Sequence, residues 1–299
     1  MRPRVGHPCG NPSRDSLVSG ALVLIATPIG NLGDLSPRAV EELATAELIC
    51  CEDTRRTGLL LKHAGVSGVR LKRVDEHTER AARREVLEIL GTGGRVAVVT
   101  DAGTPGISDP GEALVAAAAG EGHEVVVVPG PSAVIAALVG SGLPTRRFVF
   151  EGFLARKGRE RGEQLAQIAA EHRTVVLYES PKRTEATLRA LTEVCGADRR
   201  AAVGRELTKL HEEFVRGTLE ELAGWAAQGI KGEIVIVVEG QSAKADVSDE
   251  RIVAALRIEL AAGSSTRDAV AKTTVELGVR RGRVYDLALG IPGSVTPPS

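Results

Sequence analysis

The sequence predicts an α/β protein with two α/β domains followed by a small helical appendage. In the first half, short apolar runs alternate with helical patterns at a spacing of about 25 residues, which is typical of repeated βαβ units. In the second half, the strand-like segments alternate apolar and polar residues, as antiparallel strands do. Beyond Ser248 the apolar spacing is helical only.

Composition limits the class of protein. A chain of 299 residues with 43% hydrophobic residues is long enough to bury two cores. The charge is balanced, with 38 basic and 39 acidic residues, which excludes a surface coated in positive charge for non-specific nucleic-acid binding. An aromatic content of 2% argues against the base-stacking platforms of single-strand binders, but not against an enzyme that grips RNA by its backbone.

The cysteines and the apolar runs indicate a cytoplasmic protein. Cys9, Cys50, Cys51 and Cys195 form no CxxC pair, so we expect reduced thiols and neither a disulfide framework nor a zinc site. No metal ligand set is apparent elsewhere. No apolar run is long enough to cross a bilayer, and the first 20 residues lack the apolar segment of a signal peptide.

Strands in the first half each run into a polar or glycine-rich loop. The first strand begins at Ala21, and its loop leads to a helix with Ser36 as N-cap and Pro37 at the first helical position. A second strand follows at 48–51, an amphipathic helix at 80–90, and further strands at 95–100 and 125–128. Ser132 is the expected N-cap of the next helix.

The loop DAGTPGISDPG at 101–111 dominates the first half. It joins a β-branched apolar run to an alanine-rich helical pattern, the layout of a ligand-binding turn at the carboxyl end of a buried parallel strand. Its glycines allow backbone to approach a ligand closely, and its prolines reduce the entropy lost on ordering. The alternative is an ordinary tight strand-to-helix connection.

A polar cluster at 52–56 follows the second strand. Asp53 and Arg55 would then lie at the carboxyl end of a strand, on the same sheet edge as the other loops. The competing interpretation is a solvated helix start, whose acidic residues suit the helix dipole.

The character of the sequence changes near residue 142, where arginines become frequent and glycine-proline loops rarer. We expect strands at 148–153, 174–178, 200–204, 213–216 and 233–239, then a polar linker and helices at 251–261, 266–277 and 282–289. The last two helices have the size of a helix-turn-helix, with a helical cap as the alternative. The predicted segments are a disordered extension at 1–20, α/β domains at 21–142 and 143–245, and an appendage at 248–290.

Common cofactor motifs are absent. No GxGxxG follows the first strand, and GxxxxGK[ST], HExxH and GxSxG do not occur. What remains is a cofactor held mainly by backbone groups in a crevice at the strand ends.

Seven ordered motifs carry a resemblance to a known family. They are TPIGNLGDLSPRA (27–39), EDTR (52–55), TDAGTPGISDPG (100–111), VVPGPSA (127–133), YESPKR (178–183), RELTK (205–209) and KGEIVIVVEG (231–240). The chain resembles the tetrapyrrole methylase superfamily from about Ala21 to the C-terminus, and within it the branch that 2′-O-methylates a cytidine ribose in the decoding region of 16S rRNA. Where the porphyrin-modifying members have a GxGPG-type loop, this chain has ATPIGN, which matches the RNA-modifying branch.

The resemblance implies a non-Rossmann S-adenosylmethionine enzyme, usually a homodimer, acting on 16S rRNA or the small ribosomal subunit, with the cofactor between two α/β domains. The implied cofactor-binding residues are Pro28, Gly30, Asp101, Gly103, Thr104, Pro105, Gly106, Ser132, Ala133, Tyr178 and Gly232. The candidate catalytic residues are Glu179 or Asp53 as proton acceptor and Arg55 as an orienting group. The candidate RNA-binding residues are Arg156, Lys157, Arg159, Arg183, Arg205 and Lys209.

Two other functions remain open at this level. The same fold could C-methylate a tetrapyrrole such as a cobalamin or siroheme precursor, although the basic segment at 146–161 disfavours that acceptor. A non-catalytic module that senses a nucleotide-like ligand through the loops is the third alternative.

Overall fold

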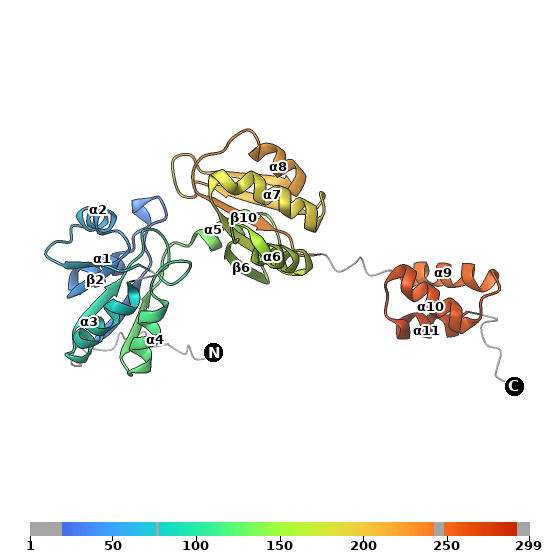
Figure 1. Ribbon diagram of the computed structural model, residues 1–299, viewed down its shortest axis with the longest axis horizontal. Helices are drawn as coiled ribbons and strands as arrows, with labels where there is room; N and C mark the ends of the chain where they lie inside the picture. The colour runs from blue at the N-terminus through green and yellow to red at the C-terminus, as the bar shows by residue number, and fades with distance from the viewer. Residues whose placement is uncertain (1–19, 76–77, 242–247, 292–299) are drawn as a thin grey trace, which may run out of the picture. The chain divides into compact units, whose positions relative to one another are not determined.

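The computed structural model describes residues 20–75, 78–241 and 248–291. The chain separates into two compact units, one ending at Gly240 and one beginning at Gln241. The larger unit contains two five-stranded sheets, drawn in blue to green and in green to orange in Figure 1. The extension predicted at 1–20 lies, apart from Gly20, outside the described residues.

The first sheet is parallel throughout, with strand order β3-β2-β4-β1-β5. The strands are β1 (Ala21–Ile25), β2 (Leu48–Cys51), β3 (Arg70–Arg73), β4 (Arg95–Val98) and β5 (Glu124–Val128). The connecting helices are η1 (Leu32–Asp34), α1 (Pro37–Thr45), α2 (Thr54–Ala64), α3 (Glu79–Gly91) and α4 (Glu112–Gly120). The mostly parallel sheet expected from the βαβ spacing is therefore confirmed.

Helices cover both faces of the first sheet, because its buried strands are apolar on both sides. One face packs on α1 and α2 through residues such as Leu43 and Leu61. The other packs on α3 and α4 through residues such as Val86 and Leu114. Because helices cover both faces, a ligand can reach the sheet at the carboxyl ends of its strands.

Helix-capping residues in the sequence predicted the starts of several of these helices correctly. Ser36 accepts a hydrogen bond from the backbone N–H of Ala39, and Pro37 begins α1. Asp53 is the N-cap of α2, so the helix-start interpretation of the polar cluster is confirmed, and the cluster also follows the end of β2. Ser132 precedes its helix without donating or accepting a side-chain cap hydrogen bond.

Strand β3 was missed because its sequence, Arg-Leu-Lys-Arg, lacks an apolar run. It is an edge strand, where charged side chains are tolerated and discourage pairing with other chains. Arg70 and Lys72 of β3 form ion pairs with Glu85 of α3.

The second sheet is mixed, with strand order β6-β7-β10-β8-β9. Its strands are β6 (Phe148–Phe153), β7 (Thr174–Glu179), β8 (Arg200–Arg205), β9 (Glu213–Thr218) and β10 (Ile234–Val238). Only β6 and β7 pair in parallel, and the other three pairings are antiparallel, as the alternating pattern predicted. The helices α6 (Gly158–Ala170), α7 (Pro181–Cys195) and α8 (Leu219–Ala226) cover one face.

The opposite face of the second sheet packs on α5 (Ala133–Gly140), which directly follows the last strand of the first sheet. Val134, Ala137 and Leu138 of α5 lie in the same core cluster as Val176 and Val237 of the second sheet. The chain thus enters the second core before residue 142, and a domain boundary at that position stays a prediction.

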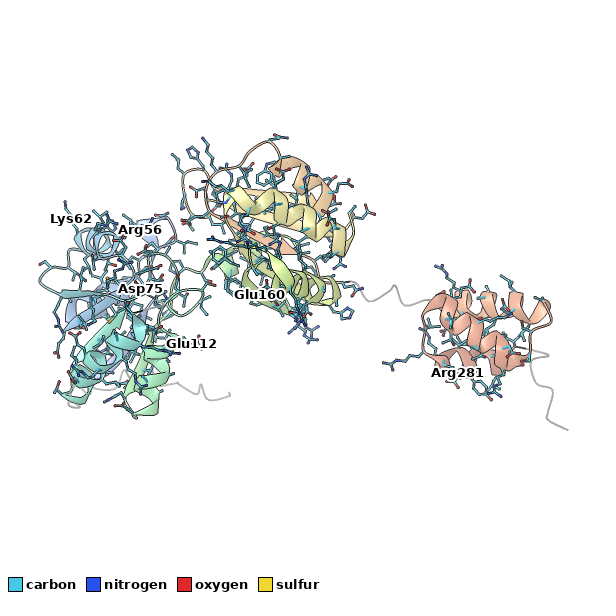
Figure 2. All side chains as sticks on the ribbon, in the orientation of Figure 1. Arg56, Lys62, Asp75, Glu112, Glu160 and Arg281 are labelled. Atoms are coloured by element: carbon cyan, nitrogen blue, oxygen red, sulfur yellow. The ribbon has the colours of Figure 1, made fainter. Side chains whose placement is uncertain are left out.

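The second unit contains three helices, α9 (Asp249–Ala261), α10 (Thr266–Leu277) and α11 (Arg281–Leu289). They bury a core of their own, including Leu256, Val270 and Val284. Helix α10 has Ser265 as N-cap and ends at Gly278, whose φ of 62° is left-handed, as expected. Arg281 begins α11 and is exposed (Figure 2).

Cys50, Cys51 and Cys195 are free thiols, as expected, and Cys9 lies outside the described residues. Burial raises the pKa of Cys50 to about 12, which keeps this thiol protonated and unreactive. Among the described residues no helix is long and apolar enough to cross a membrane.

Candidate cofactor pocket and active site

A cavity of about 460 Å³ opens at the carboxyl ends of β4 and β7, within the size range of small-molecule and cofactor sites. Its wall on the first sheet consists mainly of the loop after β4, with contributions from the loops after β1, β2 and β5. Its wall on the second sheet comes from the end of β6, the end of β7 and the start of β10.

The loops after β1 and β4 are joined by backbone hydrogen bonds. The N–H of Thr27 donates to the carbonyl of Gly103 at 2.8 Å, and the N–H of Gly103 donates back to the carbonyl of Thr27 at 3.1 Å. The buried Thr27 hydroxyl donates to the carbonyl of Thr100 at 3.1 Å. Gly103 has a φ of 89°, a conformation that favours glycine, so the turn is fixed by its sequence.

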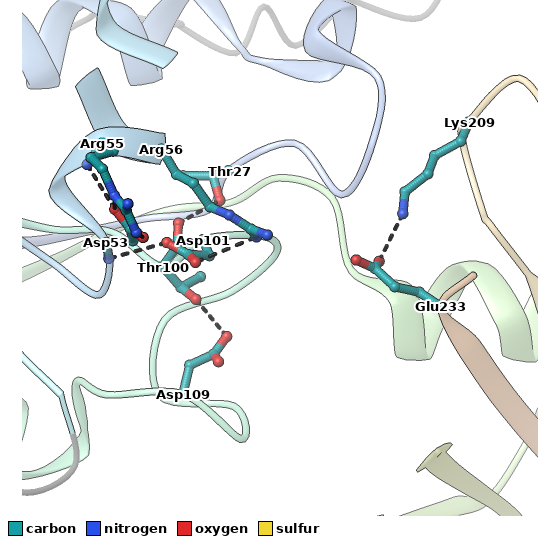
Figure 3. A network of polar contacts seen from close by, with 9 residues as sticks. All are labelled: Thr27, Asp53, Arg55, Arg56, Thr100, Asp101, Asp109, Lys209 and Glu233. Carbon is teal, nitrogen blue, oxygen red and sulfur yellow. Dashed lines mark hydrogen bonds and ion pairs between the residues drawn. The ribbon is translucent and has the colours of Figure 1, made fainter. Parts of the chain in front are cut away.

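Asp101 links the loop after β4 to the loop after β2 (Figure 3). Its Oδ1 accepts a hydrogen bond from the backbone N–H of Asp53 at 3.2 Å, and its Oδ2 lies 3.4 Å from a guanidinium nitrogen of Arg56. Asp53 itself turns away from the cavity, capping α2 and pairing with Arg55, whose side chain is 89% exposed. Hydrogen bonds from Arg55 lower the pKa of Asp53 to about 2.

Two further carboxylates face the same cavity. Asp109 accepts a 2.6 Å hydrogen bond from the Thr100 hydroxyl (Figure 3). Burial, and then the charge of Asp101, raises its pKa. Burial, followed by the charges of Asp109 and Asp101, also raises the pKa of Glu52. The first-sheet wall is therefore acidic and holds carboxylates that bind protons more readily than usual.

Glu79 holds the far end of the same loop. Helix α4 begins after Gly111, which has no side chain to cap the helix. The buried carboxylate of Glu79, from the start of α3, accepts hydrogen bonds from the N–H groups of Gly111 and Leu114, both at 3.0 Å. A carboxylate at a helix N-terminus is favoured by the helix dipole.

The second-sheet wall combines an aromatic cluster with Glu179. Tyr178 packs edge-on against Phe150 at a ring-centroid distance of 4.9 Å, and its ring is tilted against that of Phe153 at 5.4 Å. Burial, and then the charge of Asp109, raises the pKa of Tyr178 to about 12. Glu179 lines the cavity, but its carboxylate accepts hydrogen bonds from the Ser180 N–H and the Thr187 hydroxyl and pairs with Arg183.

A turn from 206 to 209 packs against the loop after β1. Glu206 accepts hydrogen bonds from the N–H of Glu233 and from Lys209, and Lys209 also pairs with Glu233 at 3.1 Å (Figure 3). Gly232 is required here, because a Cβ would lie 2.4 Å from Cγ of Glu206. Gly30 has the same role toward Lys209, whose Cγ would lie 2.3 Å from an added Cβ.

The cavity collects about half of the residues expected to bind cofactor. Its lining includes Asp101, Gly103, Thr104, Ser132, Ala133 and Tyr178. Pro28, Gly30, Pro105, Gly106 and Gly232 lie outside the lining and shape the loops behind it. Of the candidate catalytic residues, Glu179 lines the cavity, whereas Asp53 and Arg55 do not.

The expected RNA-binding residues divide into two groups. Arg156, Lys157 and Arg159 are exposed just beyond β6. The other three are held within the fold: Arg183 donates to the carbonyl of Leu154, Arg205 pairs with Glu213, and Lys209 lies in the turn described above.

Several lining residues are not among the predicted site residues, namely Glu52, Arg56, Asp109, Phe153 and Glu233. Glu52 and Asp109 belong to the quoted motifs and Arg56 to the polar cluster at 52–56, so their position after a parallel strand could have identified them. Glu233 could not be found that way, because it precedes its strand, and only the antiparallel direction of β10 brings it to this edge.

The cavity lies at strand ends and is walled by glycine-containing loops, and no GxGxxG dinucleotide fingerprint follows the first strand. The chain belongs to the family of tetrapyrrole (corrin/porphyrin) methylases, whose model matches residues 21–223.

Within that family, the chain is similar to proteins named ribosomal RNA small subunit methyltransferase I. The relative from Synechocystis sp. is 45% identical over 273 residues, covering 90% of this chain and 98% of the relative. The relative from Mycobacterium tuberculosis is 46% identical over 273 residues, covering 91% and 95%.

The fold is also that of solved methyltransferases. A crystal structure of uroporphyrin-III C-methyl transferase from Thermus thermophilus, complexed with S-adenyl homocysteine, matches with a TM-score of 0.52 at 18% identity. The match covers 74% of this chain and 97% of that one.

Proposed function

We propose that this protein transfers a methyl group from S-adenosylmethionine to the ribose 2′-oxygen of a cytidine in the decoding region of 16S rRNA. One observation carries the proposal: in a chain 45% identical to a protein named ribosomal RNA small subunit methyltransferase I, six of the seven ordered motifs contribute residues to one acidic cavity of cofactor size. The substrate is the small ribosomal subunit or its RNA, and the protein acts in the cytoplasm.

The residues of the cavity fit this cofactor. Among the described residues that line it, five are carboxylates and only Arg56 is basic. S-adenosylmethionine carries a sulfonium and an ammonium group, so an acidic, half-buried wall attracts it. The backbone at Gly103 and Thr104 and the rings of Phe153 and Tyr178 supply the apolar and hydrogen-bonding surface that an adenosine requires.

When bound, S-adenosylmethionine supplies a methyl carbon to which the acceptor oxygen bonds as the carbon–sulfur bond breaks, the bonding pair remaining on sulfur. The contribution of the protein is positioning, which is worth about 7–11 kcal/mol when both reactants are aligned. The rigid pairing of Thr27 with Gly103 and the anchoring of the following loop by Glu79 serve that purpose.

The exposed basic residues after β6 are placed to contact phosphate. Arg156 and Lys157 follow Phe153, which lines the cavity, by three and four residues. Contacts from arginine and lysine to the RNA backbone position the substrate without reading its sequence. Arg183 and Arg205 serve the same interface indirectly, by holding the loop after β6 and the end of β8.

A homodimer is part of the proposal. Val127 on the edge strand β5 is 56% exposed, and Ile135 and Val139 on α5 are 47% and 66% exposed. An uncovered apolar edge strand is an aggregation hazard, and a second copy of the chain covers it. Sedimentation equilibrium of the wild type and of V139K tests this: we expect a dimer for the wild type and a shift toward monomer for V139K.

The test of function uses purified protein with labelled S-adenosylmethionine and either small ribosomal subunits or free 16S rRNA from cells that lack it. Mass spectrometry of the nucleosides should show 2′-O-methylcytidine. Incorporation into a porphyrinoid instead of RNA would favour tetrapyrrole methylation. Cofactor binding without transfer to any acceptor would favour a sensing module.

A further inference from the structure

The carboxylate of Asp109 is aimed into the cavity by its surroundings. Its Oδ2 accepts the hydrogen bond from Thr100, a residue only 3% exposed whose own carbonyl is bound by Thr27. The preceding residue, Ser108, has a φ of 60°. A left-handed conformation at a non-glycine residue costs free energy and tends to occur at functional sites. The fold thus maintains a strained loop and a buried anchor for one carboxylate.

The charged groups around Asp109 come from several elements. Glu52 at the end of β2 and Asp101 at the end of β4 are acidic, and Tyr178 of β7 is polar but neutral. The basic groups are engaged elsewhere: Arg56 pairs with Asp101, and Lys209 with Glu206 and Glu233. Asp109 therefore faces acidic neighbours and makes no ion pair among the described residues, so it retains affinity for a proton.

The other carboxylates of the region are less suited to accept a proton. Glu179 is buried and already holds three partners. Asp101 is committed to the Asp53 N–H and to Arg56, and Glu233 to Lys209. Burial raises the pKa of Glu52 as it does that of Asp109, but Glu52 directly follows β2 and is not part of the loop at 101–111. Asp109 lies on the ligand loop at 101–111, directly after the lining residue Ser108, and its carboxylate is held by the Thr100 hydroxyl without an ion pair among the described residues.

We propose that Asp109 accepts the proton of the acceptor hydroxyl during methyl transfer and that Thr100 orients its carboxylate. This inference rests on the proposed function. The O–H bond breaks, its electron pair stays on the oxygen that bonds to the methyl carbon, and the proton moves to the carboxylate. The carboxylate loses its negative charge as the sulfonium loses its positive charge, so the cavity's net charge is unchanged. The proton then leaves to water.

The test compares D109N with the matched control D198N. Asparagine keeps the size of aspartate and can still accept the Thr100 hydrogen bond, but it cannot take a proton. Asp198 is exposed in the turn before β8, outside the lining of the cavity. Single-turnover methylation of small subunits is measured from pH 5 to 9, and cofactor binding is measured separately by calorimetry.

We expect D109N to lower the methylation rate by about 10²- to 10⁴-fold, the usual contribution of a general base. The wild-type rate should rise with pH through an apparent pKa above that of an ordinary aspartate, and D109N should lose this rise. Calorimetry should show that D109N lowers cofactor affinity far less than it lowers the rate, because four other carboxylates remain in the lining, and that D198N leaves the affinity unchanged. D198N should match the wild type in rate and pH profile.

Two results would overturn the inference. One is a D109N rate within threefold of the wild type across the pH range. The other is loss of cofactor binding in D109N, which would make Asp109 a binding residue. Failure of the proposed function is distinguishable, because the wild-type protein would then methylate no RNA at any pH.

Discussion

Removing the carboxylate of Glu79 should weaken both the fold and the cofactor pocket. Glu79 Oε1 accepts hydrogen bonds from the N–H groups of Gly111 and Leu114 at 3.0 Å, and Glu79 is only 8% exposed. In E79A both donors remain buried at the start of α4 without an acceptor. Each hydrogen bond to a charged group contributes about 1.5–3 kcal/mol. Because the two share one oxygen, we expect a total loss of about 2–4 kcal/mol in unfolding free energy.

The same substitution should weaken cofactor binding, because Gly111 is the last residue of the ligand loop at 101–111. The N–H of Gly106 donates to the carbonyl of Pro110 at 3.1 Å, so the segment from 106 to 111 moves with the start of α4. We expect E79A to weaken cofactor binding at least about tenfold, equivalent to 1.4 kcal/mol. E79Q keeps an oxygen acceptor and should lose only about 1 kcal/mol in stability.

Urea unfolding followed by circular dichroism, together with calorimetry of cofactor binding, measures both effects. The matched control is E88A, on the exposed side of the same helix, where Glu88 forms a surface ion pair with Arg84. We expect E88A within about 0.5 kcal/mol of the wild type. An E79A protein as stable as E88A, with unchanged cofactor affinity, would refute the reasoning.

Three further predictions concern other parts of the chain. Gly106 has a φ of 83°, so G106V should abolish cofactor binding in calorimetry while the circular dichroism spectrum is retained, and normal binding would contradict this. Hydrogen bonds from Arg55 lower the pKa of Asp53 to about 2. Because the folded pKa of Asp53 lies below its unfolded value, the stabilisation that Asp53 gives to α2 is present above about pH 4 and is lost as the pH falls toward 2. D53N should therefore remove this part of the pH dependence of the unfolding free energy. An unchanged dependence of the unfolding free energy between about pH 2 and 4 would contradict this. Truncation after Gly240 removes a unit that has its own core. We expect the truncated protein to bind the small ribosomal subunit more weakly in filter binding and to bind the cofactor with unchanged affinity. An equal loss of both affinities would argue against separate roles for the two units in RNA binding and cofactor binding.

Local chemistry explains which elements the sequence could predict. Ser36 with Pro37, and Ser265 with Gly278, are cap signals whose hydrogen bonds and dihedrals lie within a few residues, and the structure has both helices where expected. The loop at 101–111 was likewise identified from residues that determine its own backbone.

Long-range packing explains the rest. Strand β3 has no apolar run and is held by its pairing with β2 and by Glu85 of α3. Helix α5 is apolar on most sides, and nothing within it indicates that it packs on the second sheet. The cap that Glu79 provides to α4 joins residues more than 30 positions apart, which no local pattern reports.

The sequence identified the loops of the candidate site better than the roles of its residues. Glycine and proline specify a backbone shape, so the cavity walls could be anticipated. A carboxylate acquires its role from its neighbours. Glu179 is bound by three groups, whereas Asp109 is anchored by one hydroxyl and faces acidic groups, and the chemical type of the two residues is nearly identical. The relative proton affinities of the carboxylates therefore could not be predicted from the sequence and required the structure.

The negative charge that lines the cavity should influence both the release of the spent cofactor and the way in which RNA approaches. Transfer converts a cationic cofactor into a neutral thioether, so the acidic wall that favours binding of the reactant gives no such advantage to the product, which should leave more easily. On the proposed function, the same wall repels RNA phosphates, and the exposed Arg156 and Lys157 attract them outside the cavity. We therefore expect a nucleotide to enter with its ribose toward the cavity and its phosphates near Arg156 and Lys157. Selection of a sugar hydroxyl over other RNA atoms would follow from this arrangement of charge before any base is read.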